Sequence, residues 1–530
     1  MGHIHLLDCT LRDGGYINNW EFGFEAIRGI TRNIARSGVE YLEVGFIKGD
    51  TFSRNRTVYP DAGCIEEIIA PKAPGLMYAG MVDMSDPVPP ERIGPRRASS
   101  LDAIRVIFKK DRREEGYAFC AQMKKLGYAV FAQLVGTDGY SDAEFLQTIE
   151  RFNALEPHVL SLVDTLGAIR EKQFLRLVCL ADNNLKPHIG LGYHSHNNLQ
   201  QAFGNARSLV ELNLARDIHI DACVLGMGRG AGNLNLELFA EYLNSTGRKS
   251  YRLEPMLEIA DAYLHDIRRR HFWGYSLPYY LSACNGCHPN YARYFSEKQT
   301  LTAKALHEIM RGMTPGDRRT YSPETAEQYY LRYMENYVDD AETVRKLAEA
   351  FSGRAILLLG PGAGILARAE KIRAFIRERK ALVISLNFYS DIFGADYIFS
   401  SNMRRYVHLQ GREGVRKIVT SNMKEAAGYD FMINFSTYRA GPQEIADNAA
   451  VMALNMLEAA GVRRVYAAGL DGYRREGAVN YCSEALDFHF SDSCERRNKA
   501  ISRALHELGK RMDIRFLTPS LYEKEASIHG

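Results

Sequence analysis

The sequence predicts an α/β protein with an N-terminal (β/α)8 barrel, a helical extension, and a C-terminal open parallel sheet of Rossmann-like type. Three observations support this prediction. Eight short apolar runs alternate with helix-like segments over the first half of the chain, a purely helical stretch follows, and the alternation then resumes. Strands that alternate with helices form parallel sheets, and eight such units are the number that closes a barrel.

The eight expected strands are short and rich in Val, Ile and Leu. They are residues 4–8, 41–46, 76–82, 103–108, 129–135, 159–164, 189–194 and 220–226. Segments such as "FEAIRGITRNIARSG" and "KQFLRLVCLADNN" separate them, and their apolar residues recur at helical spacing. A doubly wound open sheet is the alternative, because local pattern does not show whether a sheet closes.

Three domains are expected: the barrel at 1–255, a helical extension and connector at 256–350, and the Rossmann-like domain at 351–530. The middle stretch has helix-like segments such as "TAKALHEIMRGM" and no strand-like run. The last part begins with strand, glycine-rich turn and helix in "AILLLGPGAGILARAEKIRAFI". Further strand-like runs and one long helix continue this pattern, which is typical of an open parallel sheet.

Composition narrows the class of protein. The 530 residues include 67 Lys and Arg and 64 Asp and Glu, a net charge of +3. This small charge does not indicate the excess of basic residues that is typical of nucleic-acid binding. No apolar run approaches the roughly 20 residues that span a bilayer, and the N-terminus does not resemble a secretory signal. Nine scattered cysteines are typical of reduced thiols. We therefore expect a cytoplasmic protein without nucleic-acid or membrane partners.

Two histidines end the seventh expected strand in "GYHSHNN". Residues two apart on a strand point to the same side, so His194 and His196 face one space unless they are neighbours by chance. In a closed barrel the seventh, eighth and first strands are adjacent, and chemistry gathers at their carboxyl ends. Asp13 follows the first strand and Asn233 follows the eighth, so these four residues are expected around one cation. Oxygen and imidazole ligands suit Mg²⁺, Mn²⁺, Zn²⁺ and other first-row ions.

The motifs "TLRDG", "HSHNN" and "GMGRGAGN", in this order, resemble the metal-dependent aldolase, lyase and acyl-transferase superfamily. Its members include 4-hydroxy-2-oxovalerate aldolase and hydroxymethylglutaryl-CoA lyase. The resemblance covers the first 300 or so residues. It implies that Asp13, His194 and His196 bind a divalent metal, joined by Asn233. Mg²⁺ or Mn²⁺ is expected, with Zn²⁺ or Co²⁺ as alternatives. The resemblance also implies that Arg12 steadies an enolate.

Tyr16 departs from the pattern of the hydroxy-oxovalerate aldolases, which have a histidine three residues after the metal-binding aspartate. A phenol with a pKa near 10 is a poor base at neutral pH. The proton path is therefore left open between Tyr16, another group and water. Glu43, near the end of the second expected strand, is a further candidate catalytic residue. Arg105, Gln133 and Asp164 occupy similar positions and line the pocket or support it.

The favoured function is a divalent-metal-dependent aldolase that joins a pyruvate enolate to an aldehyde, such as a sugar or a nucleotide-linked sugar. Two alternatives remain: a Claisen-type acyl-CoA condensing enzyme or lyase, and a non-catalytic scaffold or nucleotide-binding module. The complete set of metal ligands together with Arg12 favours an enzyme. We expect a homo-oligomer that acts on small 2-oxo acid and aldehyde substrates.

The second α/β part has its own candidate site. The turn at residues 360–364, "GPGAG", offers backbone N–H groups before a helix, where phosphate binds well. Gly360, Gly362, Asn387 and Asp471 are the candidate binding residues. The GPG turn, the following asparagine and the late "AGLDGY" resemble nucleotide-binding domains of bacterial sialyltransferases and pterin pyrophosphokinase-like proteins. This resemblance implies a nucleotide or nucleotide-linked sugar. The alternative is a domain whose asparagines only stabilise turns.

Overall fold

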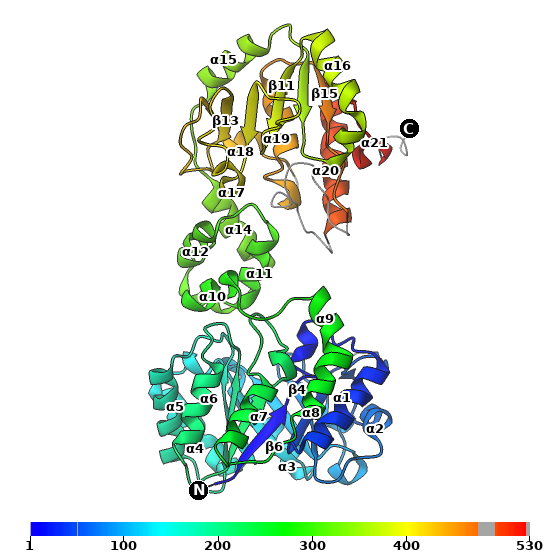
Figure 1. Ribbon diagram of the computed structural model, residues 1–530. Helices are drawn as coiled ribbons and strands as arrows, with labels where there is room; N and C mark the ends of the chain where they lie inside the picture. The colour runs from blue at the N-terminus through cyan, green and yellow to red at the C-terminus, as the bar shows by residue number, and fades with distance from the viewer. Residues whose placement is uncertain (1, 50, 442, 475–492, 526–530) are drawn as a thin grey trace. The chain divides into compact units, whose positions relative to one another are not determined.

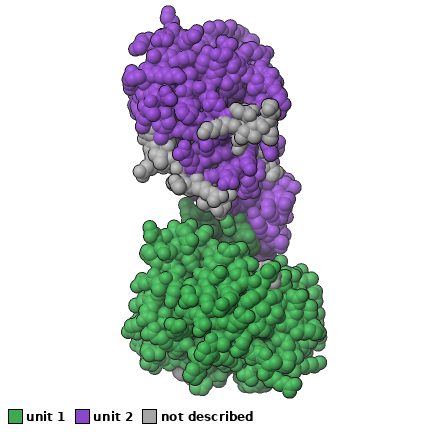
Figure 2. Space-filling model, turned by 90° about the vertical axis from the view of Figure 1, so that its right-hand side faces the viewer, with its two compact units in different colours: residues 1–293 green, residues 294–530 purple. Residues whose placement is uncertain are grey.

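The computed structural model describes residues 2–49, 51–441, 443–474 and 493–525. The chain forms two compact units, Met1–Arg293 and Tyr294–Gly530, which Figure 2 shows in different colours. The helical stretch expected at 256–350 is shared between them, because the boundary falls inside helix α11 (Pro289–Glu297). In the described part of the chain, no helix combines the length and the apolar character needed to cross a bilayer.

A closed barrel of eight parallel strands forms the centre of the first unit (Figure 1). The strands are β1 (Ile4–Asp8), β2 (Tyr41–Ile47), β4 (Met77–Asp83), β5 (Ala103–Phe108), β6 (Ala129–Val135), β7 (Val159–Asp164), β8 (Gly190–Ser195) and β9 (Ile218–Ala222). Closure comes from β1, which pairs with both β2 and β9. The barrel prediction is confirmed, and the open-sheet alternative is wrong for this part of the chain.

The strands of the barrel are buried on both faces, which explains their nearly continuous apolar runs. The surrounding helices are α1 (Phe24–Ser37), α2 (Gly63–Ile69), α3 (Arg113–Lys125), α4 (Asp142–Leu155), α5 (Glu171–Asn184), α6 (Ala202–Glu211) and α7 (Leu236–Ser245). Two details differ from expectation. The last strand stops at Ala222 instead of 226, because Leu225 and Gly226 adopt left-handed φ angles of 54° and 60°. A short extra strand, β3 (Val58–Tyr59), pairs with the end of β2.

The chain beyond the barrel strands first folds back onto the barrel. Helix α8 (Glu254–Ile259), a π-helical segment (Ala260–Leu264) and α9 (His265–Arg270) follow one another, and α8 packs on α1. Trp273 is 1% exposed, and its indole N–H donates to the carbonyl oxygen of Leu225 at 2.9 Å. This bond anchors the segment leading into α10 (Leu277–Cys284) to the loop after β9. The extension therefore reaches the strand ends where the candidate site lies.

The second unit is built on an open sheet of seven parallel strands. The strands are β10 (Ile356–Leu359), β11 (Leu382–Leu386), β12 (Tyr397–Ser400), β13 (Arg416–Thr420), β14 (Phe431–Ile433), β15 (Arg464–Ala468) and β16 (Asp513–Phe516). Their order is β14-β13-β12-β11-β10-β15-β16. Strands β11 to β14 are added on one side of β10, and β15 and β16 are added on the other. A crevice at such a switch point is the usual ligand position in open parallel sheets.

Helices complete the second unit. Those before the sheet are α12 (Ala303–Arg311), α13 (Pro315–Arg319), α14 (Pro323–Met334) and α15 (Ala341–Phe351); those within or after it are α16 (Ala369–Arg379), α17 (Met403–Tyr406), α18 (Phe435–Tyr438), α19 (Ala449–Ala459), α20 (Cys494–Gly509) and α21 (Leu521–Glu525). One core cluster joins α16 to β10 and β11, and another joins α17 to β12 and β13. The expected open parallel sheet is therefore confirmed.

Candidate active site and a second cavity

Three predicted metal ligands meet at the carboxyl ends of the barrel strands. Potential ligand atoms of Asp13, His194 and His196 all lie within 4.8 Å of one another, and all three residues are buried. Asp13 lies in the turn after β1, His194 lies in β8, and His196 follows β8 and forms an isolated bridge with Asn233. Strand adjacency thus brings residues from three distant parts of the chain to one point.

The hydrogen bonds around this cluster fit a divalent cation. The amide nitrogen of Asn233 donates to Asp13 Oδ1 at 3.0 Å, so its own Oδ1 is left over. Within the described residues, that oxygen and His196 Nδ1 are buried acceptors with no hydrogen-bond partner. A buried acceptor without a hydrogen-bond partner costs about 1–3 kcal/mol, and a cation bound to it removes this cost. One carboxylate, two imidazoles and an amide oxygen are a donor set that Mg²⁺, Mn²⁺ or Zn²⁺ accepts.

Cys9, His194 and Asp221 form a second group with ligand spacing. Burial raises the pKa of the Cys9 thiol well above its ordinary value. A thiol binds metals as the thiolate. The Asp13 group therefore fits a cation better than the Cys9 group does.

A closed ring of buried charges surrounds the cluster. Arg12 bonds Asp13 and, through Nε at 2.6 Å, Glu43. Arg105 bonds Glu43 through Nη1 at 3.0 Å and also bonds Asp221. The ring closes through His194, whose Nδ1 lies 2.9 Å from Asp221 and whose Nε2 lies 3.4 Å from Asp13. Each charged group faces an opposite charge, which lowers the cost of burying it.

The ring also sets the protonation of the cluster. Burial alone would raise the pKa of Asp13, but the charge of Arg12 and the hydrogen bond from His194 hold it well below its usual range. Burial lowers the pKa of His196 to about 3, so this imidazole is neutral and its lone pair is available. The carboxylate of Asp221 on His194 Nδ1 orients that ring with Nε2 toward Asp13, the usual arrangement behind a metal-binding histidine.

The contacts of Glu43 and Tyr16, two of the predicted catalytic residues, indicate what each can do. Glu43 is fully buried between two arginines, so it orients Arg12 and does not reach into open space. The Tyr16 ring packs edge-on against Trp20 and Phe46, and the Arg229 guanidinium lies 4.0 Å from its centroid. Burial raises the pKa of Tyr16 despite the nearby arginines. The phenol therefore stays protonated at neutral pH.

Other strand-end residues have supporting contacts. Gln133 donates to Ser161 Oγ at 2.8 Å, and Asp164 accepts the backbone N–H groups of Ala168 and Ile169. His219 lies in β9 and stacks on His5 at the opposite end of the barrel, so it has a structural role.

Sequence reasoning missed Asp221 and a pair formed by Arg229 and His288. Asp221 was hidden because a single acid within an apolar strand gives no sign of which side it faces. His288 Nε2 lies 3.4 Å from Arg229 Nη1, and the backbone N–H of Asn290 donates to His288 Nδ1 at 3.2 Å. Burial, Arg229 and Lys109 lower the pKa of His288 to about 3. No local pattern predicts that the segment after the barrel returns to the strand ends.

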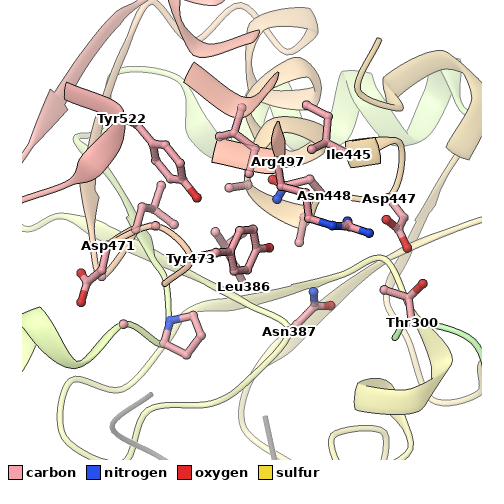
Figure 3. Close-up of a pocket in the computed structure, with 18 of the residues that line it drawn as sticks. Thr300, Leu386, Asn387, Ile445, Asp447, Asn448, Asp471, Tyr473, Arg497 and Tyr522 are labelled. Carbon is pink, nitrogen blue, oxygen red and sulfur yellow. The ribbon is translucent and has the colours of Figure 1, made fainter. Parts of the chain in front are cut away.

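The second unit contains a cavity of about 390 Å³ at its switch point (Figure 3). Gly362, Asn387 and Asp471 line it, together with residues from α19, α20 and the loop after β15. Gly360 is not part of the lining. The cavity therefore brings together three of the four residues that the sequence singled out in this unit.

The glycine turn of this unit packs closely against the loop after β15. A Cβ at Gly360 would lie 2.4 Å from the carbonyl oxygen of Gly469, and one at Gly362 would lie 2.5 Å from Asp471 Cγ. Six residues of 3-10 helix, Ala363–Arg368, separate the turn from α16, so the α-helix begins later than the sequence suggested. Gly360 and Gly362 are required because the turn after β10 and the loop after β15 come too close together to leave room for a side chain.

Fold and site together define a (β/α)8-barrel protein with a buried carboxylate–histidine cluster at the strand ends. The model of the HMGL-like family matches residues 109–262. A 4-hydroxy-2-oxovalerate aldolase of Moorella thermoacetica is 24% identical over 275 residues, which are 50% of this chain and 78% of that protein. Residues 109–262 of the first unit thus match the HMGL-like family, and the barrel as a whole is similar to these aldolases.

Two further comparisons concern the same barrel. An oxaloacetate decarboxylase of Mycobacterium tuberculosis is 25% identical over 255 residues, covering 46% of this chain and 70% of that protein. The structure of an HMG-CoA lyase from Brucella melitensis aligns with a TM-score of 0.41 and 17% identity, covering 51% of this chain and all of that one.

Proposed function

We propose that the first unit is a metal-dependent carbon–carbon lyase of aldolase type. It interconverts a 4-hydroxy-2-oxo acid with an aldehyde and a 2-oxo acid such as pyruvate. The observation that carries this proposal is the charge ring, which ties Arg12 directly to the Asp13, His194 and His196 cluster. Relatives named as aldolases and as a decarboxylase support the same class of reaction.

Asp13, His194, His196 and Asn233 would hold the cation, with Mg²⁺ or Mn²⁺ as the proposed ion. When bound, a divalent cation supplies Lewis-acid stabilisation for negative charge developing on a keto oxygen. Arg12 supplies fixed N–H donors on the adjoining side, where they are worth a few kcal/mol as charge develops. Glu43 is a positioning residue, because it fixes the guanidinium plane of Arg12.

Arg229 and His288 are proposed to bind the oxygen of the aldehyde. A neutral imidazole accepts at only one nitrogen, and Asn290 N–H already donates to Nδ1, so Nε2 carries the proton. In this tautomer Nε2–H points to the same place as the Arg229 guanidinium, whose Nη1 lies 3.4 Å from Nε2. A neutral histidine donor of this kind stabilises a developing alkoxide without needing to be protonated.

In the proposed condensation, the methyl group of the 2-oxo acid gives a proton to water and becomes the nucleophilic carbon of an enolate. That carbon forms a bond to the aldehyde carbon, and the aldehyde π electrons move to its oxygen. The resulting alkoxide is held by Arg229 and His288 and takes a proton from water. Cleavage follows the same steps in reverse. Tyr16 remains a protonated wall residue beneath Arg229.

We also propose a sugar or nucleotide-linked sugar as the aldehyde component or as a ligand of the second unit, supported by the cavity at the switch point. A cytoplasmic homo-oligomer remains the prediction for the whole protein, supported by the cysteine usage and the class of enzyme.

A coupled assay tests the proposal. Purified full-length protein is supplied with Mg²⁺ or Mn²⁺, pyruvate and a panel of aldehydes, and in parallel with acyl-CoA and 2-oxo acids. New 4-hydroxy-2-oxo acid in the first reaction supports the aldolase. Release of free CoA in the second would instead support a Claisen-type enzyme, and oxaloacetate loss alone would support a decarboxylase. No turnover of any substrate with any divalent metal would favour a non-catalytic barrel.

A further inference from the structure

The cavity of the second unit has one wall that is closed to anions. The backbone N–H groups of Gly360 and Gly362 donate to the carbonyl oxygens of Ala468 and Gly469, at 2.8 and 3.0 Å. The N–H of Gly364 donates to Asp471 Oδ2 at 2.7 Å. These groups are used inside the protein, and a carboxylate adjoins them. An anion at the glycine turn would have to displace these hydrogen bonds, and the carboxylate of Asp471 would repel it.

The other wall offers hydrogen-bond donors. Asn387 Oδ1 accepts the backbone N–H of Ser401 at 3.1 Å, and Asn402 Oδ1 accepts that of Arg405 at 3.1 Å. Both oxygens are therefore occupied. The two amide nitrogens have no acceptor among the described residues, yet they are not among the solvent-shielded atoms that lack a partner. They consequently open onto the cavity, which both residues line.

Backbone geometry adds to the case for Asn387. Its φ of 62° lies in the left-handed region, although it is not glycine. Such a conformation costs an ordinary residue about 1 kcal/mol, less for asparagine, and it persists where surrounding contacts hold it. Figure 3 shows its side chain reaching into the space bounded by Tyr473, Asn448 and Thr300. The strained strand end thus presents an amide to the cavity.

Arginines line the cavity together with the carboxylates of Asp447 and Asp471. Arg405 follows Asn402 on α17, lines the cavity and is 7% exposed. Arg497 also lines it and donates to the backbone carbonyls of Glu444 and Glu297. Tyr473, Tyr522 and several aliphatic residues complete the cavity with apolar surface. Such a site combines donors for an anion with faces for a sugar or base.

We infer that this cavity binds a phosphate ester, a sugar phosphate or a nucleotide, with its phosphate on the amides of Asn387 and Asn402 beside Arg405. The inference deepens the ligand proposed for the second unit but does not depend on the aldolase chemistry of the barrel. It moves the anion from the glycine turn to the opposite wall. A side chain at Gly362 would disturb the turn with or without a ligand, so the two asparagines are the informative positions.

Aspartate substitutions provide the test. In Asn387→Asp and Asn402→Asp, a carboxylate oxygen still accepts the backbone N–H of Ser401 or Arg405, so the fold is retained. The group that faces the cavity changes from a donor to an anion. Asn55→Asp is the matched control, since Asn55 is exposed in the other unit and its Oδ1 accepts the N–H of Phe24 at 3.0 Å.

Binding is measured by calorimetry on the full-length protein carrying His194→Ala and His196→Ala, which removes metal-bridged binding at the barrel. The titrants are UDP, CMP, glucose 6-phosphate and uncharged glucose. We expect at least one phosphate ester to bind, and both aspartate variants to weaken it at least tenfold at an unchanged melting temperature. Nucleotide-only binding identifies the base as the second determinant, and binding of glucose 6-phosphate identifies the sugar.

Three results would overturn the inference. The first is no heat from any phosphate ester at millimolar concentration with folded protein. The second is binding that survives both aspartate substitutions, which would place the phosphate elsewhere. The third is glucose binding as tightly as its phosphate. None of these outcomes bears on turnover by the barrel, so failure here and failure of the aldolase proposal are separable.

Discussion

Arg12 is held from three directions, by Asp13, by Glu43 and by the ring of Phe46, whose centroid lies 5.6 Å from its guanidinium carbon. A planar fork that bonds two carboxylates leaves its remaining N–H groups in fixed directions. Lysine keeps the charge but not this geometry. The residue is therefore suited to stabilise charge at one defined point beside the metal cluster.

Arg12→Lys should lower kcat for aldol cleavage by about 100-fold or more, the usual loss when one fixed oxyanion donor is removed. Metal content should stay at the wild-type level, because Asp13, His194 and His196 are unchanged. Steady-state kinetics and elemental analysis on the same preparation test this. Arg36→Lys, an exposed surface change, is the control. Wild-type turnover in Arg12→Lys would show that Arg12 does not stabilise the enolate.

Tyr16 and His288 should respond differently to substitution. Tyr16→Phe keeps the packing on Trp20 and Phe46 and should retain most aldol turnover, because the phenol is not the base. His288→Leu removes a donor to the proposed alkoxide and should lower kcat/KM for cleavage by about 10- to 100-fold. Exchange of pyruvate methyl protons needs no aldehyde and should be unaffected.

His288→Gln keeps an N–H donor and should recover part of the lost activity. Its pH profile between 5 and 8 should parallel that of the wild type, since the low pKa of His288 keeps the ring neutral there. A severe defect in Tyr16→Phe with a silent His288→Leu would reverse the two assignments.

At the scale of single elements, strand positions were predictable and their ends were less so. Seven of the eight barrel strands were expected within one residue at each end, because buried parallel strands read as continuous apolar runs. The eighth was expected too long, since Leu225 and Gly226 break it by backbone angle while remaining apolar or small. The two-residue strand β3 is too short to leave a periodic signal.

Asp8, at the end of β1, should make stability depend on pH. It is fully buried and accepts the N–H and hydroxyl of Thr10, and burial raises its pKa to about 7. The unfolded carboxyl titrates near 4, so between pH 4 and 7 the folded state binds more protons than the unfolded one. The stability that this group contributes is complete below pH 4 and falls as pH rises through 7.

Asp8→Asn removes that titration. Relative to wild type, the variant should therefore gain free energy of unfolding between pH 5 and pH 8, by up to about 1.4 kcal/mol per pH unit within the window. Urea unfolding at both pH values measures the difference, which is independent of any fixed cost of the substitution. Asp111→Asn, at an exposed site, is the control substitution. A difference that does not change with pH would mean that Asp8 is ionised in the folded protein.

For the whole molecule, the sequence indicated a barrel followed by a second parallel sheet, and the structure has both. Asp13, His194 and His196 could be placed together because strand order in a closed barrel dictates it. Arg105, Asp221 and His288 could not be assigned, because nothing local tells which charged side chain faces inward or where the extension returns. The boundary between the units, inside α11, could not be predicted from the sequence either, because helical periodicity continues across it.

Two units with separate cores should unfold as separate transitions. Anything that binds only the folded state of one unit stabilises that unit by mass action. Scanning calorimetry of the full chain should show one transition that rises with Mn²⁺ and falls with EDTA. A phosphate ester should raise the other transition. A single transition moved equally by both additives would show that the units unfold together.

In the proposed reaction, the barrel forms the enolate of a 2-oxo acid at a metal site made by Asp13, His194 and His196. The most direct measurement is the exchange of pyruvate methyl protons in deuterated water, followed by NMR without any aldehyde. We expect exchange that requires added Mg²⁺ or Mn²⁺, stops with EDTA, and is lost in the folded His194→Ala, His196→Ala double variant. Exchange that proceeds equally without metal, or in the double variant, would contradict it.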